Sequence, residues 1–108
     1  MLAKQNMNPQ SLPNPYLVQK IMSASPDELI SYIYEAAIKA CFQEDHRRAM
    51  EAVQELINAL NFEAGELSKT FYTVYTGILD QIHKRDFDTA RETLIDLKKT
   101  WSQAMNLR

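Results

Sequence analysis

The two histidines are the residues of this 108-residue chain best suited to phosphotransfer or metal chemistry. His46 and His83 each lie at or near a predicted turn. A phosphotransfer histidine usually has a lysine and a glycine just after it, and neither histidine has a glycine beside it. A di-iron bundle needs Glu-x-x-His pairs on two helices, whereas the only acidic residue three positions before a histidine is Asp80. We therefore interpret both as solvated side chains and expect no metal; a histidine phosphotransfer domain is kept as the third functional hypothesis.

The single cysteine, Cys41, excludes a disulfide framework and a cysteine zinc site. It falls on the apolar side of its predicted helix, where a small buried hydrophobe is the expected role. No serine stands in a glycine-flanked turn, and carboxylates pair only on predicted helix surfaces. We therefore expect no enzyme and no cofactor, and a reducing compartment, the cytoplasm.

Composition excludes several further classes. Twelve basic and fourteen acidic residues give a net charge of −2, which argues against a general nucleic-acid binder. No apolar run approaches the length of a membrane span or a signal-peptide core. All four prolines fall within the first 26 residues, and the only glycines are Gly65 and Gly77. This excludes glycine-rich phosphate loops and favours long helices. For Gly77, in mid-helix, we expect a close contact with another helix.

Four long helices are predicted after a distinct N-terminal stretch. Residues 1–24 are interpreted as a mobile tail and a short lid helix, and residues 25–108 as a bundle. The helices are expected from Pro26 to about Phe42, from Asp45 to about Leu60, from Glu66 to about Lys84, and from the turn at residues 85–88 to about Gln103.

An internal repeat organises these helices. A displacement of 41 positions carries Tyr34 onto Tyr75 and Asp45 onto Asp86, with other apolar positions in register. Each half is a helix, a turn at an aspartate and a second helix. Two such hairpins predict an all-α, antiparallel up-down four-helix bundle with the short N-terminal helical segment packed on it. A two-repeat solenoid is the alternative, but such arrays usually need three or more repeats.

The first of these helices is apolar over more of its circumference than one seam requires. Ile30, Ile38 and Phe42 lie beside its main stripe, and Tyr72 is similarly placed on the third helix. Either the N-terminal segment covers this excess or the excess forms a groove for an apolar peptide.

Several motifs occur in a fixed order along the chain: Asn14-Pro15-Tyr16, Ser25-Pro26-Asp27-Glu28-Leu29, Tyr34-Glu35-Ala36-Ala37-Ile38-Lys39, Leu60-Asn61-Phe62-Glu63-Ala64-Gly65-Glu66-Leu67, Tyr72-Thr73-Val74-Tyr75, and Leu94 through Trp101. Their order and spacing resemble the flagellar export chaperone FliS family. Ala36 stands where that family usually has glycine, and the stretches around both aspartate turns are shorter than in typical members. The resemblance is therefore to a compact or divergent member.

The resemblance implies a cytosolic, ATP-independent chaperone. Such a protein binds the disordered C-terminal segment of flagellin, or of a related exported subunit, prevents premature polymerisation and delivers it to the flagellar export gate. We expect a monomer or weak dimer without nucleic-acid or membrane partners. A helical adaptor or co-chaperone that binds a folded export-system partner is the alternative. The cargo-binding candidates are Tyr16, Ile21 and Met22 in the lid, and Ile30, Tyr34, Ile38, Phe62, Tyr72 and Tyr75 in the groove.

Overall fold

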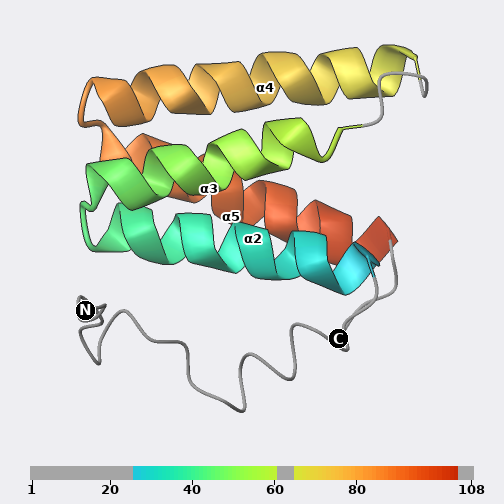
Figure 1. Ribbon diagram of the computed structural model, residues 1–108, viewed down its shortest axis with the longest axis horizontal. Coiled ribbons are helices and arrows are strands. Elements are labelled where there is room, and N and C mark those ends of the chain that lie inside the picture. Colours follow the sequence, from blue (N-terminus) through green and yellow to red (C-terminus); the bar gives the residue numbers. More distant parts are fainter. Residues whose placement is uncertain (1–25, 61–64, 105–108) are drawn as a thin grey trace, which may run out of the picture.

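Helices account for all the regular structure in residues 26–60 and 65–104, the part of the chain that the computed structural model describes. The helices are α2 (Pro26–Phe42), α3 (His46–Asn58), α4 (Glu66–His83) and α5 (Phe87–Ala104), and these residues form no strand (Figure 1). The all-α prediction is confirmed. The predicted bounds agree with the structure to within about two residues, and α3 ends at Asn58 rather than Leu60.

The turns that end α2 and α4 have the same backbone geometry. Glu44 and Arg85 adopt φ values of 55° and 67°, in the left-handed region. The backbone amide of the next residue, an aspartate, donates a hydrogen bond to a carbonyl of the preceding helix. Asp45 donates to the carbonyl of Ala40 at 2.9 Å, and Asp86 donates to the carbonyl of Gln81 at 2.8 Å. This left-handed ending satisfies carbonyl groups that would otherwise lack partners. The predicted repeat of 41 residues therefore extends to the conformation of the turns.

The same two aspartates begin the next helices. The Asp45 carboxylate accepts a hydrogen bond from the amide of Arg48 at 3.2 Å, and the Asp86 carboxylate accepts one from the amide of Thr89 at 3.3 Å. Each bond occupies an amide that has no partner within its own helix. In each turn a single aspartate therefore makes the last hydrogen bond of one helix and caps the N-terminus of the next helix. This explains why the connections between α2 and α3 and between α4 and α5 are so short.

The four helices enclose one core. Helix α2 packs against α3 and α5, and α4 packs against α3 and, less extensively, against α5. Both turns lie at one end of the assembly, at the left of Figure 1, which we call the turn end. The core is formed by Tyr34, Ala37, Ala40, Cys41, Ala49, Val53, Leu56, Tyr75, Ile78, Ile82, Phe87, Ala90 and Leu94.

The two glycines have different surroundings. Gly65 has a φ of 82°, which side chains rarely adopt, and it directly precedes α4. Gly77 is exposed in α4, and a Cβ atom built there would meet no atom of another helix within 4 Å. The expectation of a close helix contact at Gly77 was therefore wrong. Its repeat equivalent, Ala36, is also exposed, so this position is solvent-accessible in both hairpins.

Candidate functional site

Two of the predicted groove tyrosines lie in the core and bind each other. Tyr34 on α2 and Tyr75 on α4 are 0% and 4% exposed, and their hydroxyl oxygens lie 2.5 Å apart. They are the pair that the 41-residue displacement superposes. In this structure neither ring is accessible to a ligand, so a role in binding would require the core to open.

Burial changes the chemistry of these hydroxyl groups. Burial, and then the hydrogen bond with Tyr75, raises the pKa of Tyr34 far above its usual value. Burial also raises the pKa of Tyr75, and the hydrogen bond with Tyr34 partly offsets this rise. Both side chains are thus neutral, and each buried hydroxyl group has the other as its hydrogen-bond partner. The pair joins the two halves of the repeat across the bundle.

The other predicted residues are distributed over several surfaces. Ile30 and Ile38 are half-buried against the core, whereas Tyr72 is 45% exposed on α4. The predictions for Tyr16, Ile21, Met22 and Phe62 lie outside the described residues.

A small cavity brings two of the predicted groove residues, Ile30 and Tyr75, close together. Its volume is about 90 Å³, and its wall also includes Trp101. The Trp101 indole N–H donates to the carbonyl of Asp27 at 3.2 Å, which ties the end of α5 to the start of α2. A space of this size holds a side chain at most, so it is a packing gap near the end of the bundle opposite the turns.

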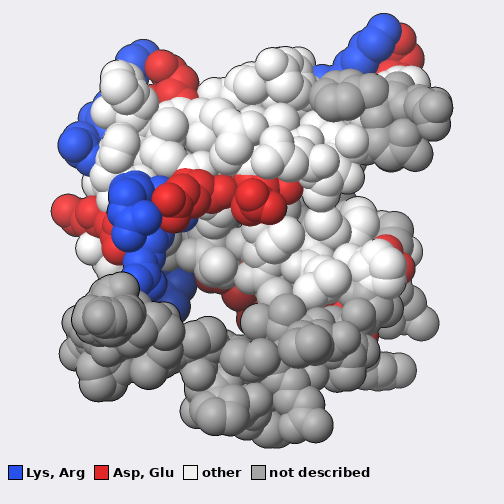
Figure 2. Space-filling view, viewed as in Figure 1, with Lys and Arg blue, Asp and Glu red and all other residues white. Residues whose placement is uncertain are grey.

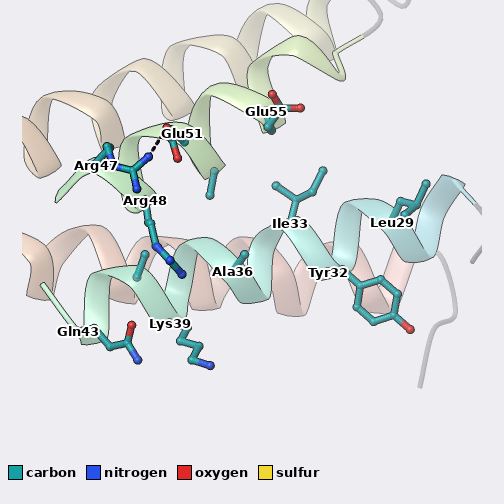
Figure 3. A pocket seen from close by; sticks show the side chains of 12 residues that line it. Leu29, Tyr32, Ile33, Ala36, Lys39, Gln43, Arg47, Arg48, Glu51 and Glu55 are labelled. Carbon is teal, nitrogen blue, oxygen red and sulfur yellow. Dashed lines mark hydrogen bonds and ion pairs between the residues drawn. The ribbon is translucent and has the colours of Figure 1, made fainter. Parts of the chain in front are cut away.

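The larger opening is a groove of about 600 Å³ between α2 and α3 (Figure 3). In this view Ile33 rises from α2 towards α3, and the long side chain of Arg48 descends from α3 into the space between the helices. The lining is apolar towards the start of α2 and polar along α3. We call it the α2–α3 groove; it is lined by Leu29, Tyr32, Ile33, Ala36, Lys39, Ala40, Gln43, Arg47, Arg48, Glu51, Ala52 and Glu55.

Along the α3 wall of this groove, basic side chains come first, nearest the turn end, and acidic side chains follow. Figure 2 shows basic and acidic side chains together at the turn end and an acidic row that continues from there along α3, with uncharged surface above this row. Arg47 and Arg48 line the groove at the turn end, and Glu51 and Glu55 line it further along. The groove therefore combines an apolar floor with a positive end and a negative end, a combination suited to holding a peptide rather than to catalysing a reaction.

Sequence reasoning identified the apolar excess of α2, but the predicted residues Ile30 and Ile38 lie on a different side of the helix from the open groove. Successive residues turn about 100° around a helix, which places Ile38 about 160° from Ala36. Ile38 packs against the core, whereas Ala36 lies in the floor of the groove. Tyr32 lies about 100° around the helix from Ile33, outside a single seam, and its position was the available signal for the observed groove.

The turn end brings together the two histidines considered for chemistry. The rings of His46 and His83 have centroids 6.2 Å apart. Within residues 26–60 and 65–104, no three histidine, cysteine or carboxylate side chains form a group that could hold a metal ion. Nearby, Cys41 is buried, and burial raises the pKa of its thiol from 9.0 to about 11, although the charge of Arg91 opposes the shift. A buried thiol with a raised pKa is a poor nucleophile.

Comparison with protein-family models, with curated proteins and with solved structures finds no match for this chain. None of the helices in the described part of the chain is both long and apolar enough to cross a membrane.

Proposed function

We propose that this protein is a peptide-binding helical chaperone and that its cargo is the disordered C-terminal segment of flagellin or a related exported subunit. The observation that carries the proposal is the open α2–α3 groove, whose apolar floor is exposed beside the buried core. The cargo class rests on the ordered motifs that resemble the flagellar export chaperone FliS family. Burial of apolar surface in such a groove supplies the binding free energy, so no nucleotide is needed. The free-energy cost of ordering a disordered segment lowers the net affinity enough to permit release.

The proposal includes an antiparallel up-down arrangement of the four helices. It is supported by the connections: residues 43–45 join α2 to α3, and residues 84–86 join α4 to α5. Connections this short favour antiparallel neighbours. The predicted N-terminal lid, which includes Tyr16, is proposed to pack on this bundle and to be displaced by cargo.

Titration of the full chain with a fluorescent flagellin C-terminal peptide tests the cargo. We expect binding at micromolar concentrations, lost in Ala36→Trp, because the indole fills the floor of the groove without entering the core. Gly77→Trp is the matched control, since it places the same side chain at the equivalent position of the second hairpin. Absence of binding at tens of micromolar would refute flagellin as cargo, and equal binding by both variants would exclude the groove as the site.

A second candidate function is an adaptor that binds a folded export-system partner. It is favoured by large apolar side chains exposed outside the groove: Leu67 on α4 is 65% exposed, and Ile95 on α5 is 45% exposed. Binding to a folded export component that persists in Ala36→Trp but is lost in Leu67→Ser would favour this function over the chaperone.

A further inference from the structure

The α2–α3 groove has a direction. Arg48 stands near the turn end of its α3 wall and Glu55 stands seven residues further along the same helix. At 1.5 Å per residue the two side chains are rooted about 10 Å apart along the axis, so an occupant about two helical turns long meets opposite charges at its two ends.

These charges are available to a ligand. Arg47 and Glu51 form an ion pair of 3.0 Å, but their side chains are 74% and 61% exposed, and such pairs contribute little and exchange readily. Arg48 lies 3.5 Å from Asp45, in another exposed pair. Glu55 makes no ion pair within 4 Å with any of the described residues, so none of their cations neutralises it.

The second hairpin provides an internal comparison. At the repeat positions of Leu29 and Tyr32 it carries Thr70 and Thr73, whose hydroxyl groups donate to carbonyls of their own helix. The position of Arg47 is occupied by Asp88. The same backbone repeat is therefore compatible with a polar, acidic surface, and the apolar floor with a basic end belongs to the first hairpin alone.

We propose that the α2–α3 groove selects one direction of an amphipathic partner segment, with a carboxylate of the segment at Arg48 and a basic group at Glu55. This rests on the groove being the peptide site of the proposed function and adds the polarity of its occupant. The segment that makes these charge contacts belongs to a partner protein, because residues 1–25 of this chain contain two lysines and no acidic residue. A lid formed by these residues could cover the groove before cargo binds, but it could not place a carboxylate side chain at Arg48.

The test measures where each end of a bound peptide lies. The probe is a synthetic amphipathic helix with leucines on one face, three glutamates at its C-terminal end, three lysines at its N-terminal end and a nitroxide label beside the glutamates. With the full chain we expect the label to broaden the amide NMR signals of Arg47 and Arg48 and to leave those of Leu29 sharp. The double variant R48E/E55K reverses the charges at unchanged net charge, and we expect broadening to move to the Leu29 end.

Affinity supplies a second readout. Replacing both charges by glutamine, in R48Q/E55Q, should weaken binding of this peptide roughly fivefold, the effect of two exposed charge contacts, and added salt should weaken wild-type binding similarly. Ala36→Trp should abolish binding, and Gly77→Trp should leave it unchanged.

The directional proposal is overturned if the label broadens both ends equally, if R48E/E55K does not move the broadening, or if this peptide does not bind. It is also overturned if sedimentation shows that the chain forms a dimer that Ala36→Trp dissolves, because the occupant is then a second copy. Binding in the expected direction together with failure of a flagellin segment to bind would refute the cargo and retain the directional groove.

Discussion

Replacing Gly77 by alanine should stabilise the protein, although the residue lies in the middle of α4. Gly77 is exposed, does not have a positive φ, and has no atom of another helix within 4 Å of where a Cβ would stand. The substitution therefore adds no steric conflict. It restricts the unfolded chain and removes the helix penalty of glycine, which together amount to about 1 kcal/mol. For a domain of this size that raises the midpoint of thermal unfolding by about 4–8 °C.

Urea unfolding followed by circular dichroism at 222 nm measures this change directly. We expect a higher midpoint at an unchanged slope, since the surface exposed on unfolding stays the same. Gly65→Ala is the matched control, because the φ of 82° at Gly65 is unfavourable for alanine. It should destabilise by about 1 kcal/mol. A neutral or destabilising Gly77→Ala would refute the reasoning, since it would mean that the position is in contact with another helix after all.

Three further changes test the core and the turns. Tyr34→Phe should destabilise by about 1–3 kcal/mol because it leaves the buried Tyr75 hydroxyl without a partner, whereas the double change to phenylalanine should recover part of this; a double-mutant cycle with no coupling would contradict the hydrogen-bonded pair. The folded-state pKa of Cys41, about 11, lies above its ordinary 9.0, so its contribution to stability is complete below pH 9 and is lost as pH rises towards 11. Cys41→Ala should reduce that slope in pH-dependent urea melts, and an unchanged slope would exclude the thiol. Asp45→Ala and Asp86→Ala should each destabilise by about 1 kcal/mol and add in the double variant, measured by thermal unfolding; strong non-additivity would show that the two turns are coupled.

The helices were predictable because their ends are encoded locally. An aspartate that accepts from an amide three residues on needs no information from elsewhere in the chain, and Asp45 and Asp86 both do this. The repeat was predictable for the same reason. Tyr34 and Tyr75 are the clearest example. A displacement of 41 positions superposes these two residues in the sequence, and their hydroxyl groups are hydrogen-bonded to each other in the core.

The position of the groove was harder to predict, because the apolar residues of a helix do not by themselves show which of its faces a neighbouring helix covers. Tyr34 was predicted to face cargo, yet it is fully buried, whereas Ala36, only two residues away, lines the open groove. Both lie on a helix that is apolar around much of its circumference. The side that stays open is set by how close the neighbouring helices approach, which depends on contacts between segments distant in sequence.

The sequence by itself determined the helical class, the approximate helix bounds, the two equivalent turns and the absence of a disulfide within the chain. Each of these follows from residues within one turn of one another, or from counting. The tertiary structure decided that the paired tyrosines face inward, that Gly77 touches no other helix, and that an apolar groove with opposite charges at its ends lies between α2 and α3. The physical reason is that helical periodicity specifies which faces of α2 are apolar, while only packing specifies which of those faces α3 and α5 cover.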